Sequence, residues 1–116
     1  MDNAKLKKVE NCSVSVALSV IGGKWKMLIV YLIMNDINRF GKLNMMLKDI
    51  SKQMLTTQLR ELEQDGLIDR VIYPEIPPRV EYFLTQKGKA LIPIMDALKL
   101  WADDFLIKDV STSESV

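Results

Sequence analysis

The sequence predicts a mainly α-helical (α+β) fold in which one two-stranded hairpin follows a series of helices. Most of the chain repeats apolar residues at the spacing of three and four that is typical of helices, whereas only 67–73 and 79–85 are rich in β-branched and aromatic residues. With 116 residues and 48% hydrophobic content, the chain can fold around a core of its own. We therefore expect a single domain, 1–116, with a core of about 12–106 and flexible arms at 1–11 and 108–116.

The composition argues against several kinds of functional site. The chain contains no histidine and one cysteine, Cys12, so it can assemble neither the usual zinc ligand sets nor an intramolecular disulfide. It also lacks the commonest general base, which argues against an enzyme. We expect no metal, no cofactor and no catalytic residue. The longest apolar run, Met27–Met34, is eight residues and too short for a bilayer, which indicates a soluble, cytoplasmic protein.

Charge is distributed unevenly along a chain whose net charge is only +1. Residues 39–60 contain five cations against one anion, whereas residues 96–116 contain two cations against five anions. A protein with one surface facing an anion shows such an asymmetry, although many soluble proteins reach it by chance. The distribution is compatible with a nucleic-acid partner but does not identify one.

Two helices are predicted before residue 36. The first ends at the Gly22-Gly23 pair and is short and amphipathic. The second, within 24–36, is apolar almost all round and too long for a typical strand, so we expect it to be the buried centre of the fold. The first helix places Val14, Ala17, Leu18 and Ile21 on one face, and the second places Trp25, Leu28, Ile29, Leu32 and Ile33 on its main stripe.

A helix-turn-helix is predicted next. Helical spacing relates Leu43, Met46, Leu47 and Ile50, and only a brief polar turn separates this third helix from the segment 51–66. In that segment Ser51 suits an N-cap, Gly66 suits a left-handed C-cap, and Leu55, Leu59 and Leu62 share one face. The first helix of the pair would brace the second.

The polar face of 51–66 changes character along its length. Its first half offers cations and hydrogen-bonding side chains that suit phosphates and base edges, whereas its second half carries Glu61, Glu63 and Asp65, which would repel phosphates. Only the first turns should therefore approach nucleic acid. From this stretch alone, an ordinary amphipathic surface helix remains an alternative. The exposed residues of the first half are Lys52, Gln53, Thr56, Thr57 and Arg60.

The hairpin and one long helix complete the chain. Three prolines within 74–78 predict a stiff, projecting tip, because proline donates no ladder hydrogen bond. Thr85 suits the N-cap of a helix from Gln86 to about Ile107, and Pro93 predicts a kink in it. This helix is apolar on more than one side, so we expect it to pair with a second copy of itself. Its main stripe contains Leu91, Ile94, Met95, Leu98, Trp101, Ala102 and Phe105.

This order of elements is that of a winged helix-turn-helix with a two-stranded wing and a C-terminal dimerisation helix, and particular motifs are also familiar. They are Ile21-Gly22-Gly23-Lys24-Trp25, Arg39-Phe40-Gly41 with Leu43, Ile50-Ser51, Met54-Leu55, Leu59-Arg60-Glu61-Leu62-Glu63, Asp65-Gly66-Leu67-Ile68, the hairpin from Tyr73 to Tyr82, and Leu84-Thr85. In this order they resemble the HxlR-type branch of the MarR-like regulators. The resemblance covers about Cys12 to Phe105.

The resemblance implies a homodimer that binds double-stranded DNA at a palindromic operator and represses or activates transcription. The 51–66 helix would be its recognition helix, with Ser51 at its start. Arg79, at the base of the proline tip, would reach the minor groove or its flanking phosphates, and Arg39 and Lys42 would meet phosphates. The dimer contacts would come from Leu91, Met95, Leu98, Trp101 and Phe105.

Other interpretations remain open at this point. Arg60 could pair with Glu63, Arg79 could pair across the hairpin with Asp69, and Thr57 could be a half-buried packing residue. A winged helix can also serve as a protein-interaction module without specific DNA binding. The nearly neutral net charge and the acidic second half of 51–66 favour that alternative.

Cys12 is a candidate redox or electrophile sensor, because some members of the resembled family use a cysteine at the start of the first helix. A helix N-terminus favours a thiolate and so raises its reactivity. The sequence departs from the family pattern at Ser13, where proline is frequent, and at Ser19, where an acidic residue is usual. A small apolar side chain at a dimer seam is the structural alternative. A small-molecule or oxidant effector is compatible with either.

Overall fold

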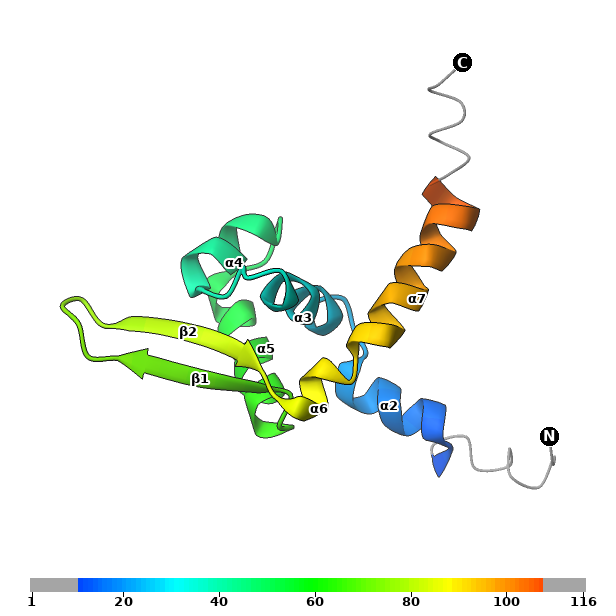
Figure 1. The fold of residues 1–116 in the computed structure, drawn as a ribbon, viewed down its shortest axis with the longest axis horizontal. Helices are drawn as coiled ribbons and strands as arrows, with labels where there is room; N and C mark the ends of the chain where they lie inside the picture. The colour runs from blue at the N-terminus through cyan, green and yellow to red at the C-terminus, as the bar shows by residue number, and fades with distance from the viewer. Residues whose placement is uncertain (1–10, 108–116) are drawn as a thin grey trace, which may run out of the picture.

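A helical body with one projecting antiparallel hairpin makes up the fold in the computed structural model, which describes residues 11–107 (Figure 1). The predicted arms 1–11 and 108–116 lie outside the described residues, apart from Asn11. The elements are α2 (Ser13–Ile21), α3 (Lys26–Met34), α4 (Phe40–Met46), α5 (Lys52–Gln64), β1 (Ile68–Tyr73), β2 (Arg79–Leu84), α6 (Gln86–Lys89), α7 (Ile92–Ala102) and a final π-helical turn, η2 (Asp103–Ile107). This order confirms the predicted α+β winged helix-turn-helix.

Helix α3 lies at the centre of the core, as the sequence predicts. Ile29, Val30 and Ile33 are buried in one cluster with residues from the helix-turn-helix, the wing and α7. Leu28 was expected on the same buried stripe, and this expectation is wrong, because its side chain is 45% exposed. A helix that is apolar almost all round has no polar face to indicate which side is buried, so spacing alone could not exclude Leu28.

Helices α4 and α5 form the predicted helix-turn-helix. Leu43, Leu47 and Ile50 are buried, but Met46 is 55% exposed, which corrects its placement on the buried face. The reason is that α4 ends at Met46. The chain then turns through Asp49, whose φ of 73° is left-handed, so Ile50 reaches the core through the turn and not by continuing the helix.

Helix α5 has the predicted caps and buried face. The Ser51 hydroxyl oxygen accepts a hydrogen bond from the Met54 N–H at 3.0 Å, as an N-cap does. Gly66 adopts a φ of 75°, which lets the chain leave the helix without the steric cost of a side chain. Leu55, Leu59 and Leu62 are almost completely buried. The orientation of α5 is therefore fixed by the core beneath it.

Strands β1 and β2 pair from Ile68 opposite Leu84 to Tyr73 opposite Arg79. Tyr82 is buried, and Val80 and Leu84 pack against the core, so every second residue of β2 faces the core. The Tyr82 N–H also donates to the Asn38 carbonyl at 2.9 Å, which attaches the hairpin to the segment before α4. The wing is thus anchored at its base, while its proline-containing tip projects (Figure 1).

The predicted C-terminal helix is divided into α6 and α7. The Thr85 hydroxyl oxygen accepts from the Gly88 N–H at 3.0 Å and caps α6, as expected. The chain leaves α6 at Ala90, and α7 begins two residues later with Pro93 in its first turn. Proline is compatible with a first turn, where its missing N–H has no intrahelical partner. The proline therefore marks a boundary between two helices and not a kink within one.

Helices α2 and α7 lie on the side of the body opposite the wing (Figure 1). No residue of α2 is buried, and Val14 and Leu18 are 68% and 57% exposed. Of the apolar face predicted for this helix, Ile21 packs against the core, whereas Val14 and Leu18 stay exposed. By length and composition no single helix in residues 11–107 could cross a membrane, although α2 and α3, bent by 73° at their junction, pass that test as a pair.

Candidate nucleic-acid interface

The polar face of α5 is open along the first half of the helix. Lys52, Gln53, Thr57 and Arg60 are exposed and Thr56 is half-buried, while the opposite face of the same helix is packed into the core. The interpretation of Thr57 as a half-buried packing residue is thus wrong. The structure brings these side chains together on one surface, as the sequence predicts.

Hydrogen bonds within α5 determine what its hydroxyl groups can offer. The Thr56 and Thr57 hydroxyls donate to the carbonyl oxygens of Lys52 and Gln53 at 2.8 and 3.0 Å. Each threonine therefore presents an acceptor oxygen and a methyl group, which suit a cytosine amino group and a thymine methyl group. The Ser51 oxygen accepts from the helix backbone, so its hydroxyl proton remains available to a phosphate.

Two of the three acidic residues in the second half of α5 form ion pairs within the chain. Glu61 Oε1 lies 2.7 Å from the Nζ atom of Lys26, a buried lysine at the start of α3. Glu63 Oε1 lies 3.6 Å from Arg70 Nε on β1. The proposed pairing of Glu63 with Arg60 is not among the ion pairs of residues 11–107. Arg60 thus remains exposed at the boundary between the two halves.

Arg79 is the first residue of β2, directly after the proline tip. The Nη2 atom of its guanidinium lies 3.0 Å from Glu75 Oε2, and the Nη1 atom lies 3.8 Å from Glu81 Oε2. The same group lies 4.0 Å from the centre of the Tyr73 ring, which is close enough for a cation–π contact. Pairing with Asp69 is excluded by the register, because Asp69 lies opposite Phe83. We call Tyr73, Glu75 and Glu81 the wing clamp.

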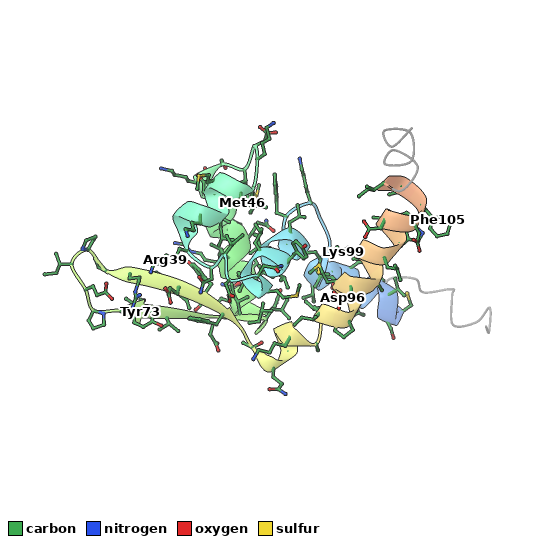
Figure 2. All side chains as sticks on the ribbon, turned by 45° about the horizontal axis from the view of Figure 1, so that its top comes forward. Arg39, Met46, Tyr73, Asp96, Lys99 and Phe105 are labelled. Atoms are coloured by element: carbon green, nitrogen blue, oxygen red, sulfur yellow. The ribbon has the colours of Figure 1, made fainter. Side chains whose placement is uncertain are left out.

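Arg39 belongs to the same charged group. Its Nε and Nη2 atoms each lie 3.2 Å from Glu81 Oε2, so one carboxylate bridges an arginine before α4 and an arginine on the wing. Figure 2 shows Arg39 and Tyr73 along the wing, with Phe105 at the far end of α7. Lys42 is exposed on α4. The structure therefore brings Arg39 and Arg79 together at Glu81, and Lys42 lies in the first turn of the helix that Arg39 precedes.

The wing clamp was not predicted from the sequence. Glu75 and Arg79 are four residues apart on the two sides of a turn, and outside a helix this spacing does not predict a contact. Nothing in the sequence pattern marks Glu81 as a partner of Arg79. The cross-strand partner of Arg79 follows only from the register. One buried guanidinium atom, Arg79 Nε, has no hydrogen-bond partner among the described residues.

Two further ionisable features bear on the site. Burial raises the pKa of Tyr82, the Arg70 charge opposes that shift, and the phenol therefore stays neutral near pH 7. Among residues 11–107, no group of three acidic, cysteine or histidine side chains is placed to bind a metal ion.

Cys12 lies away from this surface, at the N-cap of α2. The Ser15 N–H donates to its Sγ atom at 3.4 Å, and the side chain is half-buried. The predicted position of the cysteine at the start of the first helix is confirmed.

The residues predicted to form a dimer differ in exposure. Leu98, Trp101 and Phe105 are 52–65% exposed on the outer side of α7 and η2, and the Trp101 and Phe105 rings lie 6.3 Å apart. Leu91 is half-buried, and Met95 packs into the core of its own chain. Only the first three residues form a continuous exposed apolar face.

Comparison with known proteins agrees with this geometry. The family described as HxlR-like helix-turn-helix matches residues 20–110. An uncharacterized HTH-type transcriptional regulator of Methanothermobacter thermautotrophicus is 54% identical over 90 residues, which are 78% of this chain and 69% of that protein. The regulator YdeP of Bacillus subtilis, also uncharacterized, is 42% identical over 83% of this chain and 75% of its own length.

Solved structures give the same result. The redox regulator HypR in its oxidized form is 43% identical and superposes with a TM-score of 0.76 over 80% of this chain and 96% of HypR. The fold, the exposed first half of α5 and these relatives agree. The chain is a helix-turn-helix transcriptional regulator and belongs to the HxlR-like, MarR-related family.

Proposed function

We propose that the chain acts as a homodimer that binds a palindromic operator in double-stranded DNA. The first half of α5 enters the major groove, and the wing brings Arg79 to the adjacent minor groove. The observation that supports this proposal most directly is the division of α5, whose leucine face is buried while Lys52, Gln53, Thr57 and Arg60 are exposed. A helix fixed in this way presents its polar side chains at a constant angle, as base recognition requires.

The pairing of the acidic residues limits how deeply α5 enters the groove. Glu61 is bound to Lys26 and Glu63 to Arg70, so this half of the helix is attached to α3 and β1. Carboxylates also repel phosphates. The contacts with bases are therefore assigned to Lys52, Gln53, Thr56 and Thr57, with Arg60 at the edge of the contact surface and Arg39, Lys42 and Ser51 at phosphates.

The salt dependence of DNA binding tests the proposal. The affinity for the DNA upstream of the gene would be measured between about 50 and 200 mM salt, over which a protein with several phosphate contacts loses roughly 10³-fold or more in affinity. A flat response would contradict the proposal.

The Gln53→Ala variant should relax specificity at one base pair by about 1–3 kcal/mol. Arg79→Ala should weaken binding mainly at A·T-rich flanks, because a narrow minor groove attracts arginine.

A control variant separates specific contacts from general loss of charge. Lys99→Gln removes an exposed cation on α7, on the side of the body opposite the wing (Figure 1). It should leave both the affinity and the salt slope unchanged. Equal losses from Lys99→Gln and Lys52→Gln would contradict the assigned surface.

A protein-interaction module is the alternative function. The observation that favours it is the wing clamp, because Arg39 and Arg79 already contact carboxylates of their own chain. DNA binding that persists at physiological salt would decide against this alternative. Loss of all binding there, with the fold intact, would support it.

We further propose that oxidation of Cys12 regulates DNA binding. The cysteine caps a helix through its Sγ atom, and the similar protein HypR is named a redox regulator. Hydrogen peroxide would oxidise the Cys12 thiol to a sulfenic acid with release of water. Condensation of the sulfenic acid with the Cys12 thiol of a second copy would give an intersubunit disulfide and release a second water. The rate of Cys12 alkylation, measured as a function of pH, reports directly on the reactivity of the thiol. Peroxide should release the wild-type protein from DNA but should not release the Cys12→Ser variant. If peroxide has no effect on DNA binding by the wild type, the role of Cys12 is structural.

A further inference from the structure

The tip of the wing, residues 74–78, has an unusual composition for an exposed turn. Such turns are ordinarily rich in Gly, Asn, Asp and Ser, whereas the sequence of this one is PEIPP. All of its residues are exposed, and the Ile76 side chain is completely exposed. Single exposed apolar side chains are common on folded proteins, so exposure alone gives Ile76 no role. What distinguishes Ile76 is the structure that supports and surrounds it.

The residues around Ile76 restrict the shape of the tip. The three prolines of 74–78 limit its backbone, because each ring fixes one φ angle. Tyr73 and Arg79 are paired at the base of the tip, and the Glu75 N–H donates to the Tyr73 carbonyl oxygen at 2.8 Å. Arg79 also contacts Glu75 across the tip at 3.0 Å. Ile76 is therefore presented in a restricted position before any partner binds, which lowers the entropy lost on binding.

Two arginines lie beside this apolar tip. Ile76 and the two prolines that follow it line a hollow of about 340 Å³ together with Arg39, Arg79 and Glu75. The guanidinium groups thus outnumber the carboxylate in the lining. The tip also projects beyond the helical body on the side away from α7 (Figure 1). A projecting apolar apex with cations at its side suits the minor groove of DNA, where base edges lie between two phosphate-bearing strands.

We infer that Ile76 is an apolar wedge that enters the minor groove of the operator beside Arg79 and partly unstacks one base step. Apolar side chains inserted in this way kink the duplex and bring more of it against the protein. The inference rests on the proposed function and extends it, because an arginine requires only a narrow groove whereas a wedge requires a deformable base step. Pyrimidine–purine steps such as TA unstack most easily, so Ile76 adds a preference for such a step.

Unstacking is measured with the full-length protein and duplexes that carry the footprinted operator, each with 2-aminopurine in place of one adenine. The fluorescence of 2-aminopurine rises when its neighbouring base unstacks. We expect the wild type to raise it at one step in each half-site and to bend the duplex by at least about 20°, measured by energy transfer between the duplex ends. The fluorescence rise should disappear in Ile76→Ala and persist in Ile76→Leu, which keeps an apolar side chain of the same size. No rise with bound wild-type protein, or an equal rise with Ile76→Ala, would overturn the inference.

Affinity and its salt dependence distinguish a wedge from a phosphate contact. Ile76→Ala should lower operator affinity about threefold to tenfold, because fewer methylene groups are buried. It should leave the salt slope unchanged, because no charge is removed. The matched control is Ile72→Ala, which truncates an exposed isoleucine on β1 behind the tip and should change neither quantity. Ile76 is not part of the core, so its variants should fold. Equal affinities of the wild type and Ile76→Ala would overturn the inference.

The sequence of the unstacked step provides the last comparison. Changing this step to the stiffer AA should weaken binding by the wild type about threefold or more and should not weaken binding by Ile76→Ala. Equal losses in the two proteins would overturn the step preference. If the wild type binds the operator with a steep salt slope but unstacks no step, the inference fails and the proposed function stands. If it binds no DNA at any salt concentration, both fail.

Discussion

Arg79 combines a predicted role at DNA with close contacts to its own chain. Two carboxylates and the Tyr73 ring surround its guanidinium, so a minor-groove contact must compete with the wing clamp. Glu75 is 53% exposed in this pair, and exposed ion pairs are weak. We expect Glu75→Gln to raise operator affinity about twofold to fivefold, since it releases the arginine at a cost below about 1 kcal/mol. Fluorescence anisotropy on the operator would measure the change.

A double-mutant cycle distinguishes release of the arginine from simple removal of a negative charge. In the Arg79→Ala background, Glu75→Gln should give no gain, because the residue that it releases is absent. An equal gain in both backgrounds would show that Glu75 acts only through repulsion of phosphates. The clamp would then have no part in presenting Arg79.

Tyr82 makes stability depend on pH in the alkaline range. Burial raises its pKa from the ordinary 10.0, so above pH 10 the unfolded chain loses the phenol proton more readily than the folded chain. The stabilisation is therefore fully present below pH 10 and is lost as pH rises through the raised pKa. We expect the free energy of unfolding of Tyr82→Phe to fall less steeply than that of the wild type. Urea denaturation between pH 8 and about 11 would measure it, with Tyr31→Phe as a control outside the wing.

At the scale of the element, the start of α5 combines a stabilising cap with a predicted phosphate contact. Ser51→Ala should lower the free energy of unfolding by about 1 kcal/mol, since the Met54 N–H loses its acceptor. Ser51→Asp should retain the cap and the stability. It should nevertheless weaken operator binding about tenfold, because it places a carboxylate beside a phosphate. Wild-type affinity in Ser51→Asp would show that the first turn of α5 does not approach DNA.

Elements whose signals are local were predictable from the sequence, and α5 is the clearest example. Ser51, the leucine stripe and Gly66 each have a local cause, and all three have the expected geometry. Helix α3 shows the opposite case. Because this helix is apolar almost all round, the spacing of its residues could not show that Ile29 belongs to the core whereas Leu28 lines a pocket at the surface.

Charged contacts between elements were beyond the reach of the sequence. The bridge from Arg39 through Glu81 to Arg79 joins residues that are 42 and 2 positions from Glu81. It exists only because the hairpin folds back against the segment before α4. The exposed residues of α5 could therefore be predicted from the sequence, whereas the contacts of Arg39 and Arg79 depend on tertiary structure.

The whole molecule has two surfaces of different chemistry. The cationic helix-turn-helix and the wing lie on one side, and the exposed apolar residues of α2 and α7 lie on the other (Figure 1). Exposed apolar faces of this kind on a folded chain mark interaction sites. A second copy joined through α7 would carry a second recognition helix, which a palindromic site requires.

The exposed apolar face of α7 should hold the dimer together. Leu98 and Trp101 are 52% and 55% exposed and contribute nothing to the core, so the double variant Leu98→Glu/Trp101→Glu should fold and should sediment as a monomer. Its operator binding should show roughly half the wild-type salt slope, because one recognition helix and one wing contact half as many phosphates. Met45→Glu is the control for an added carboxylate on an exposed apolar residue and should remain dimeric. A double variant that stays dimeric would show that the dimer interface does not lie on α7. A monomer with the full salt slope would show that one copy makes all the phosphate contacts.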